Sequence, residues 1–468
     1  MIGHMTFGES IDLLQMIEAK HDLLQHRLDG WSAWCALRFP IQLALVQRGT
    51  VPVSRVPHHA RLRLLGREAL PLIRLRRARH VVKTFSSGLV EREGTRYKDV
   101  WFDDLIREIG SAFKIEQVNS PMFLPRRASA AVPSDLTTSG IEFLASVLLR
   151  TWRPRRVSLV AAEIVRVLQQ EIGSDAFAGE WVERRLRHFL VLKGLYLRLF
   201  SRIRPSYLLV ADPGEQASIA AAKEAGATAI ELQHGGTTDR FHSGYSWTRY
   251  AIPHRKHMPI PDRLFLFGEH TRCEIDQHGF WGDAIRVVGC PRVDQYRSRR
   301  TGPAAAIPTI LLTTGASVEE TIAFVAEFLR AMPRRDLRLV VKLHPVYERG
   351  PEAYEAAFGE DDRVQVISGS EDPSTFELLT QANLHLSVSS SCHYDSLGVG
   401  VPTVILGLPT HEIVMPLHEA GHALLARTPA ELGGIVGGWR GLQVPEAVSS
   451  HYFRPGAIAN MKEELVSG

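Results

Sequence analysis

Apolar residues recur at helical spacing in the first half of the chain. The stretch IDLLQMIEAKHDLLQHRL, residues 11–28, has them three and four positions apart, as an amphipathic helix does. The following DGWSAWCALRFPIQLALV is rich in Trp and aliphatic residues and is predicted to pack against a domain. Two long helices are predicted near Ser139–Leu149 and Gly179–Ile203. RHVVKTFSS and FKIEQV, between these regions, are strand candidates.

From about Pro205 short apolar strands alternate regularly with helices. A first series runs from PSYLLVAD to IRVVG, and a second runs from TILLTTG to PTVILG, the last predicted strand. Strands that are almost continuously apolar indicate parallel sheets covered by helices on both faces. The Pro- and Ala-rich break at residues 301–308 separates the two series. The pattern therefore predicts an α/β protein with two Rossmann-like domains facing a cleft and extra N-terminal helices.

Four predicted strands end in polar residues, in the sequences VADPGE, LQHGG, VKLHP and SVSSS. In open parallel sheets, ligands bind beyond the carboxyl ends of the strands. These strand ends are therefore the candidate sites.

The triple serine Ser389, Ser390 and Ser391 lies between a predicted strand and a helix start. Free backbone N–H groups and the helix dipole favour an anion there, and the hydroxyls can add hydrogen bonds to a phosphate. N-capping is the alternative, but one serine suffices for it. Gly315, in the turn TTGAS, is a second candidate for phosphate contact, although such turns are common between a strand and a helix.

The sequence KLHP supplies a lysine and a histidine, Lys342 and His344, that share one side of a strand if it stays regular that far. An imidazole can neutralise a leaving phosphate or donate a proton to it. Pro345 is expected to end the strand.

In the first domain, His234 is followed by Gly235 and Gly236, so a ligand can approach the backbone closely. Asp212, in ADPGE, can accept a proton from a hydroxyl. It can equally be a turn residue before Pro213.

Composition changes this picture only slightly. The chain has 468 residues, 45% of them hydrophobic, and a net charge of +4, which is too small to indicate nucleic acid. Residues 60–80 hold seven arginines against one glutamate and could lie on an acidic membrane surface or form a solvated helix face. The four scattered cysteines fit a reducing cytoplasm. No signal peptide or spanning helix is predicted, and no DxD, GxGxxG or P-loop sequence occurs. No metal and no cofactor is expected.

Several motifs carry a family resemblance. QHG, PDRLFLFG and VVGCPRVD resemble bacterial capsule and surface-polysaccharide glycosyltransferases of GT-B architecture. KLHP and SSS resemble the HP and Ser-rich motifs of bacterial sialyltransferases and Kdo transferases. The resemblance covers roughly residues 205–407, and HYFRPGAIANMKEEL also resembles the closing helix of such enzymes. The paired acidic-acidic-glycine motif of sialyltransferases is absent, so ADPGE is only a loose substitute for it.

The resemblance implies residue roles. His344 and the serines Ser389, Ser390 and Ser391 would meet the donor phosphates, and His234 and Gly235 would line the cleft. From the residues themselves, Lys342, Gly315 and Gly235 are further donor-binding candidates. His344, Asp212 and His234 are the catalytic candidates. It also implies an acceptor-side domain at residues 1–300, a nucleotide-sugar-binding domain at 301–450, and a closing helix at 451–468 that returns to the first domain.

The predicted function is a metal-independent glycosyltransferase that uses a nucleotide-activated sugar to build a cell-surface polysaccharide or glycolipid. The partners implied are a nucleotide-sugar donor, a glycan or lipid-linked acceptor and a membrane surface met by the Arg-rich segment 60–80, with no nucleic acid. The expected location is the cytoplasm, at the inner face of the membrane. A CDP-alcohol phosphotransferase, a nucleotide-sugar epimerase and a non-catalytic scaffold stay open as alternatives.

Overall fold

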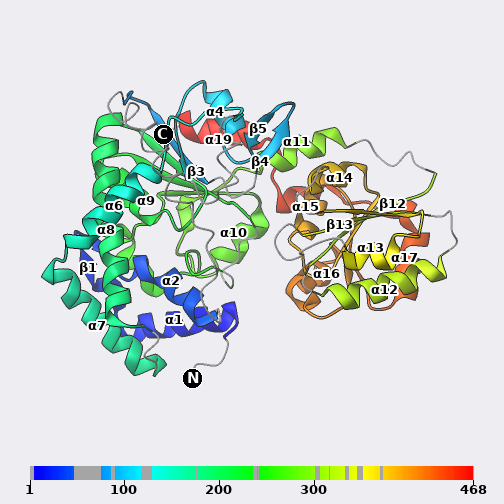
Figure 1. Cartoon of the computed structure of the whole chain (residues 1–468), viewed down its shortest axis with the longest axis horizontal. Coiled ribbons are helices and arrows are strands. Elements are labelled where there is room, and N and C mark those ends of the chain that lie inside the picture. Colours follow the sequence, from blue (N-terminus) through cyan, green and yellow to red (C-terminus); the bar gives the residue numbers. More distant parts are fainter. Residues whose placement is uncertain are drawn as a thin grey trace. The chain divides into compact units, whose positions relative to one another are not determined.

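The computed structural model describes residues 5–46, 75–85, 90–117, 129–173, 177–235, 240, 242–300, 306–315, 317–332, 337–344, 352–368 and 373–466. The chain forms two compact units (Figure 1). The first comprises Met1–Leu266, His270–Val288 and Ile458–Gly468, and the second comprises Phe267–Glu269 and Gly289–Ala457. The Pro- and Ala-rich break at residues 301–308 therefore lies within the second unit. The acceptor and donor roles of the domains stay predictions.

A seven-stranded parallel sheet forms the centre of the first unit, with strand order β11-β10-β9-β8-β3-β6-β7. The chain builds outward from β3 in one direction and then restarts at β8 on the other side. The point between β3 and β8 is therefore the topological switch at which open α/β sheets bind ligands. The strands are β3 (His80–Phe85), β6 (Phe113–Gln117), β7 (Leu136–Thr137), β8 (Tyr207–Val210), β9 (Thr228–Leu232), β10 (Arg263–Leu266) and β11 (Ile285–Val287).

Helices surround this sheet, and the longest of them, α8, packs against α2, α6, α7 and α9. Apolar residues at helical spacing give α8 a buried side, which includes Val182, Leu186 and Phe189. The helices are α1 (Phe7–His21), α2 (Cys35–Val46), α4 (Asp103–Ile109), α6 (Ser139–Thr151), α7 (Arg155–Ile172), α8 (Gly179–Ile203), α9 (Gln216–Glu224), α10 (Glu269–Ile275) and α19 (Ala457–Val466). Two small antiparallel pairs are β1 (Arg27–Leu28) with β2 (Trp31–Ser32) and β4 (Val90–Glu93) with β5 (Arg96–Asp99).

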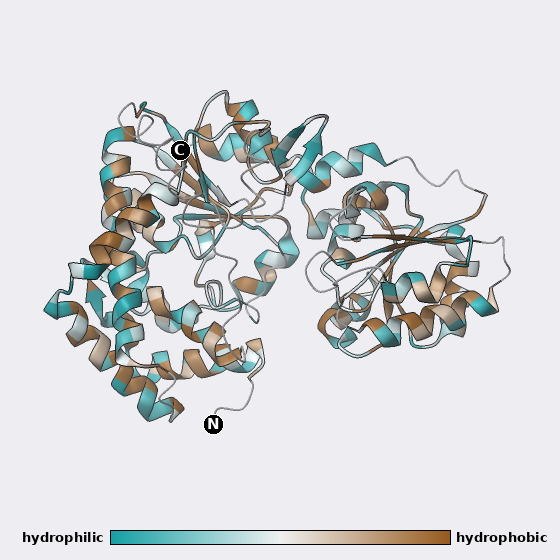
Figure 2. Cartoon of the chain, viewed as in Figure 1, coloured by the Kyte–Doolittle hydropathy of each residue, from teal (hydrophilic) through white to brown (hydrophobic). Residues whose placement is uncertain are grey.

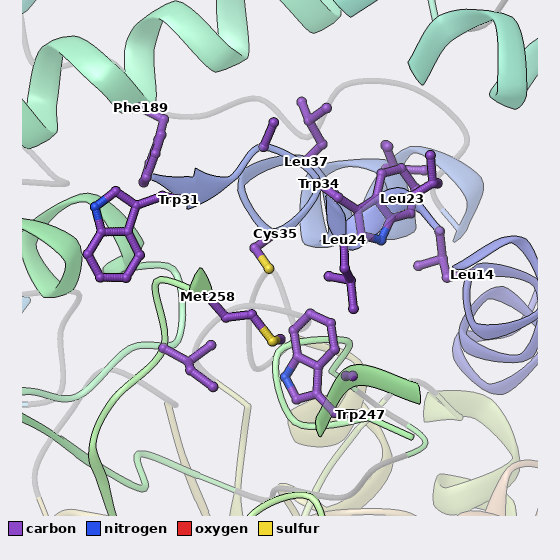
Figure 3. Packing of buried hydrophobic residues seen from close by; sticks show 14 of the residues in the cluster. Leu14, Leu23, Leu24, Trp31, Trp34, Cys35, Leu37, Phe189, Trp247 and Met258 are labelled. Atoms are coloured by element: carbon purple, nitrogen blue, oxygen red, sulfur yellow. The ribbon is translucent and has the colours of Figure 1, made fainter. Parts of the chain in front are cut away.

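The N-terminal helices α1 and α2 are part of the main core. Trp34, Cys35 and Leu37 pack in one cluster with Trp247 and Met258 of a later loop region (Figure 3). This confirms the prediction that the Trp-rich stretch packs against a domain. It also fixes the position of the loop that follows β9.

A buried ion pair holds this arrangement together. Arg38 of α2 and Glu18 of α1 are both 2% exposed, and Nη2 of Arg38 lies 3.2 Å from Oε2 of Glu18. Arg38 also donates to the backbone oxygen of Ser246 at 2.9 Å and stacks 4.0 Å from the ring centroid of Trp247. The contacts of Arg38 thus connect three segments of the chain. They supply the guanidinium with the hydrogen-bond partners that a buried charge needs.

The second unit has a six-stranded parallel sheet with order β14-β13-β12-β15-β16-β17. Its switch point lies between β12 and β15. The sheet strands are strongly hydrophobic (Figure 2), because helices cover both faces. Helices α12, α13 and α17 cover one face, and α14 and α15 lie on the other (Figure 1).

The elements of the second unit are β12 (Thr309–Thr313), β13 (Arg338–Lys342), β14 (Val364–Ile367), β15 (Leu384–Ser387), β16 (Thr403–Leu406), β17 (Leu424–Ala426), α11 (Pro291–Arg299), α12 (Val318–Ala331), α13 (Glu352–Phe358), α14 (Thr375–Gln381), α15 (Cys392–Val399), α16 (Met415–Glu419), α17 (Pro429–Gly437) and α18 (Glu446–Tyr452). PTVILG is therefore not the last strand, since β17 follows it at the sheet edge. Its three residues were too short to give a strand pattern. Helix α7 was also not predicted from the sequence.

Within the described residues, no helix is long and apolar enough to cross a membrane. The Arg-rich prediction for residues 60–80 falls mostly on residues 60–74, which lie outside the described ranges, as do Gly236 and Pro345.

Candidate functional site

Three loops of the second unit meet at the carboxyl edge of its sheet. The loop after β12, which ends at Thr313, contains Thr314 and Gly315, and the loop after β15 contains the triple serine. The hydroxyl of Ser387 donates to the backbone oxygen of Thr313 at 2.7 Å, so the two loops start from fixed neighbouring points. Because β12 and β15 flank the switch point, this edge is the position where such sheets bind ligands.

His344 is held against the same edge. Its backbone N–H donates to Oγ1 of Thr314 at 3.1 Å, and the N–H of Thr314 donates to the oxygen of Lys342 at 3.2 Å. The His344 ring is half-buried, and burial lowers the pKa of its imidazole below the usual value. The ring is therefore neutral near pH 7, and an adjacent phosphate would favour its protonation.

The side chain of Lys342 has a different partner from that of His344. Its side chain is buried, and Nζ donates to the backbone oxygen of Ser368, after β14, at 2.7 Å. Strand β13 ends at this residue, so the regular alternation that would place Lys342 and His344 on one side does not continue to His344. The donor-binding role of Lys342 stays a prediction, and contact with a ligand would have to compete with the bond to Ser368.

The three serines have different surroundings. The hydroxyl of Ser390 accepts the N–H of Cys392 at 3.1 Å, which is the capping role considered as the alternative. Ser391 is the exposed N-cap residue of α15, and no side-chain capping bond forms there. Ser389 is half-buried, and its hydroxyl lies 2.9 Å from Oγ1 of Thr410. One serine therefore caps the helix, and the hydroxyls of the other two remain at the edge of the sheet.

Thr410 belongs to a third loop, after β16, that was not predicted from the sequence. Its φ of 79° is left-handed, a conformation that β-branched residues rarely adopt. The hydroxyl of Ser317 donates to the backbone oxygen of the preceding Pro409 at 3.2 Å. This loop is thus bound to both the β12 loop and the β15 loop. Strained backbone of this kind clusters at ligand sites.

A neutral polar network lies beneath these loops. Nε2 of His385 lies 2.9 Å from Oγ1 of Thr313, and its Nδ1 lies 2.8 Å from Oγ1 of Thr403, which is 2.6 Å from Nδ1 of His393. Burial lowers the pKa of His385 well below its usual value and that of His393 to about 3. Both rings are uncharged at neutral pH, so they position the loops without adding charge to the site.

In the first unit, Asp212 and His234 are neighbours at the carboxyl edge. Oδ1 of Asp212 accepts the N–H of Gly214 at 2.6 Å, so the turn role is present. The carboxylate is also partly exposed, and its charge raises the pKa of His234 against the larger lowering caused by burial. The structure therefore brings two of the predicted catalytic residues together.

A buried acid lies behind them. Glu231, the first residue of ELQHGG, is 1% exposed and accepts the hydroxyl hydrogen bond of Tyr245. Burial raises the pKa of Glu231 to about 8, so this carboxyl is protonated at neutral pH. Alternation along β9 turns Glu231 into the protein. Gln233 is also buried and donates to the oxygen of Gly235 at 2.8 Å.

Lys83, at the end of β3, forms a buried ion pair with Glu215 on the other side of the switch point. Burial acts to lower the pKa of Lys83, but the charge and hydrogen bond of Glu215, together with Tyr196 and Asp212, raise that pKa above the usual value. The adjacent Tyr196 hydroxyl has its pKa raised by burial. The pair joins β3 to the loop after β8. Its lysine gave no signal in the sequence, because RHVVKTFSS is otherwise an ordinary strand.

His242 was also missed. Its ring stacks on Phe39 at a centroid distance of 3.8 Å, and Nδ1 accepts the N–H of Gly244 at 2.8 Å. That bond assigns the proton of the neutral ring to Nε2. Burial, assisted by the nearby His234, lowers the pKa of His242 to about 3. His242 is therefore a neutral hydrogen-bond donor near His234.

Packing does not require a glycine at position 235 or at position 315, at the carboxyl edges of the two sheets. Among the described residues, a Cβ added at Gly235 or Gly315 would meet no heavy atom within 4 Å, and neither residue has a left-handed φ. Gly244 differs, because an added Cβ would lie 2.8 Å from Nδ1 of His242 and 3.0 Å from Pro213. No group of three or more His, Cys, Asp or Glu residues that could hold a metal ion occurs in the described part of the chain.

No protein-family model and no curated protein matches this chain. Several solved structures are similar to it. UDP-GlcNAc 2-epimerase from Neisseria meningitidis, bound to UDP-GlcNAc, shares 14% identity at a TM-score of 0.51, covering 83% of this chain and 100% of the epimerase chain. The UDP-GlcNAc 2-epimerase of Methanocaldococcus jannaschii shares 11% identity at a TM-score of 0.51, over 83% and 99% of the two chains. The chain has the GT-B fold.

This confirms the predicted fold class of two Rossmann-like domains with helical additions. The calicheamicin glycosyltransferase CalG4 is also similar, with 13% identity and a TM-score of 0.44, over 84% of this chain and 95% of that one. Identities this low describe a shared fold, and the same fold serves more than one chemistry.

Proposed function

We propose that this protein is a metal-independent glycosyltransferase that transfers a sugar from a nucleotide-activated donor. The observation that carries the proposal is the convergence of hydroxyls and a helix N-terminus at the switch point of the second unit. Ser389, Ser391 and Thr410 surround the start of α15 there, and His344, just after β13, is bound to the loop after β12. This is the chemistry that recognises the phosphates of a nucleotide.

In this proposal the second unit binds the donor. The start of α15 and the serine hydroxyls bind the phosphates, and Gly315 lets a phosphate approach the backbone, since no atom of the described residues lies within 4 Å of a Cβ added there. His344 gains a proton or donates a hydrogen bond as charge develops on the departing phosphate. Lys342 adds positive charge below this site.

The first unit activates the acceptor. Asp212 accepts the proton of an acceptor hydroxyl, while His234 and Gly235 line the site. The acceptor oxygen forms a bond to the anomeric carbon as the bond from that carbon to the phosphate oxygen breaks. The electron pair leaves with the nucleotide, whose charge is stabilised by electrostatic contacts arranged before the reaction.

The acceptor in this proposal is a growing glycan or a lipid-linked sugar at the cytoplasmic face of a membrane. A cell-surface polysaccharide or glycolipid is the product. This part rests on the resemblance of QHG, KLHP and the serine triplet to surface-polysaccharide enzymes.

Epimerisation of a nucleotide sugar is the second candidate. It is favoured by the two UDP-GlcNAc 2-epimerases with TM-scores of 0.51. Such a reaction uses the same donor site and several acid and base groups, and Asp212, His234 and the Lys83–Glu215 pair are available in the first unit. It needs no acceptor, so the two functions give different products.

The test is calorimetric titration of CMP, CDP, UDP and GDP into the wild-type protein and into His344→Ala. We expect one nucleotide to bind and its affinity to fall about tenfold, about 1.4 kcal/mol, in the variant. Tyr354→Phe, a change within the buried core, is the matched control and should bind normally. Absence of binding by all four nucleotides would contradict the proposal.

The corresponding nucleotide sugar is then incubated with the protein alone and with glycan acceptors. Conversion without an acceptor identifies an epimerase, and a product that contains both sugar and acceptor identifies a transferase. Transfer of phosphorus to the product would instead identify a phosphotransferase.

A further inference from the structure

Helix α6 of the first unit turns large apolar side chains toward solvent. Phe143, Leu144, Val147 and Leu148 are 43%, 46%, 44% and 41% exposed. The opposite side of the helix is already buried, through residues such as Ala145. The helix therefore has a second apolar face that packing within this unit does not explain.

These four residues form one continuous stripe. Phe143 and Val147 are four positions apart, as are Leu144 and Leu148, so the two pairs lie in adjacent rows along the helix. We call them the α6 stripe. Exposed apolar residues are ordinary when scattered singly, whereas a contiguous group on one helix face marks an interaction surface.

Arginines follow the α6 stripe along the chain. Arg150 lies about one turn beyond Val147, and Arg153 and Arg155, which follow the end of α6, are exposed. Residues 139–160 contain four arginines and one acid, Glu142, whose carboxylate accepts a hydrogen bond from Thr138 at 3.0 Å. The end of the stripe is therefore strongly basic.

Helix α8 adds to this charge. It packs against α6 (Figure 1), and Arg187 of α8 donates to the backbone oxygens of Leu149 and Trp152 at 2.9 and 3.1 Å, which fixes the C-terminal end of α6. Arg184 and Arg185, in the same region of α8, are exposed. The basic group next to the α6 stripe thus comes from two elements held in a fixed arrangement.

We propose that the α6 stripe and the arginines beside it form a docking surface for an anionic lipid bilayer. The apolar side chains would enter the boundary between headgroups and acyl chains, and the arginines would bind lipid phosphates. The excess of positive charge selects this occupant. A second copy of the chain would bring its own arginines to the contact, where residues 139–160 offer one acid, Glu142, and the adjoining part of α8 offers Glu180 and Glu183, of which Glu183 is already paired with Arg187.

This inference goes beyond the proposed function and does not depend on it. The docking surface uses none of the residues assigned to donor or acceptor. It agrees with a lipid-linked acceptor, because docking would hold the first unit at the membrane where such acceptors lie. Nucleotide binding and bilayer binding can therefore fail separately.

The test is flotation of the full-length protein with vesicles of phosphatidylcholine, with and without phosphatidylglycerol, across a range of salt concentrations. Wild-type protein should float with the anionic vesicles and be released as salt increases. The double variant Phe143→Ser/Val147→Ser should lose at least about tenfold in vesicle affinity. Arg150→Gln/Arg153→Gln should lose about fivefold for each charge.

Ile252→Ser is the matched control, because Ile252 is 45% exposed in the same unit and lies outside the stripe. It should bind vesicles as wild type does. Equal flotation with neutral and anionic vesicles, or an unchanged affinity of the Phe143→Ser/Val147→Ser variant, would overturn the proposal. A wild-type dimer that dissociates in this variant, without vesicle binding, would also overturn it and assign the surface to a second copy. Nucleotide affinity should be the same in all four proteins.

Discussion

The hydroxyl of Ser389 lies 2.9 Å from that of Thr410, and Thr410 holds a left-handed backbone conformation with φ of 79°. The contact joins the loop after β15 to the loop after β16 at the proposed phosphate site. A β-branched residue in this conformation stores conformational free energy that the surrounding contacts must offset.

Thr410→Gly should relieve this strain and weaken nucleotide binding at the same time. We expect the free energy of unfolding to rise by about 1 kcal/mol, because glycine adopts this φ without steric cost. Nucleotide affinity should fall, because the Thr410 hydroxyl is lost. Urea unfolding and calorimetry measure the two effects. Ser389→Ala is the control: it should weaken binding without the gain in stability. A less stable Thr410→Gly protein would contradict the strain argument.

Thr314→Val should destabilise the β12–β13 edge. Oγ1 of Thr314 accepts the N–H of His344, and valine would leave that N–H without this acceptor. The expected cost is about 1–3 kcal/mol in the free energy of unfolding. Nucleotide affinity should fall as well, because His344 loses its fixed position. Thr314→Ser keeps the hydroxyl and should restore both quantities. If valine and serine behave alike, the hydroxyl does not position His344.

Glu231 should make the protein less stable as pH rises. Burial raises the pKa of Glu231 from 4.5 to about 8 in the folded state. Between these values the folded state binds more protons than the unfolded state, so stability falls with pH by up to about 1.4 kcal/mol per unit. Glu231→Gln keeps an acceptor for Tyr245 and cannot ionise.

The measurement is urea unfolding of wild type and Glu231→Gln between about pH 5 and pH 9. The variant should lose less stability over this range, and the difference between the two proteins should grow with pH. Parallel curves would show that Glu231 does not titrate there.

His242 should stay neutral, with its proton on Nε2, throughout the range in which exposed histidines titrate. Burial lowers the pKa of His242 to about 3, and the N–H of Gly244 occupies Nδ1. Besides the buried rings of His385 and His393, nitrogen NMR of the imidazoles should therefore show a further histidine whose signals do not move between about pH 5 and pH 8 and vanish in His242→Gln. A titration near the ordinary pKa would contradict the buried, stacked geometry.

Arg38→Met should destabilise the first unit strongly. It leaves the Glu18 carboxylate buried without its guanidinium partner, and removal of one member of such a pair costs about 3–5 kcal/mol. The double change Arg38→Met/Glu18→Leu removes both charges and should recover much of this loss. Thermal or urea unfolding checks the pair. Arg240→Met, which breaks an exposed pair with Asp12, is the control and should have an effect below about 1 kcal/mol.

The sequence by itself determined the fold class and most of the elements. Strands such as β8, β9, β12 and β15 lie where the apolar runs predicted them, because burial on both faces of a parallel sheet needs an uninterrupted run of apolar residues. The elements it missed include β17, which is only three residues long, and α7, although the apolar residues of α7 recur at helical spacing.

The sequence also located the strands that end in polar residues, but only the tertiary structure decided which of these strand ends are neighbours. The sheet order places β15 beside β12, and this brings Ser387, two residues before the serine triplet, to Thr313 and the β16 loop to Ser389. The structure likewise turns Lys342 toward Ser368 and Glu231 toward Tyr245. Hydrophobic patterning is a local property of the chain. Hydrogen-bond partners and pKa values depend on contacts between residues far apart in sequence, which form only when the sheets assemble.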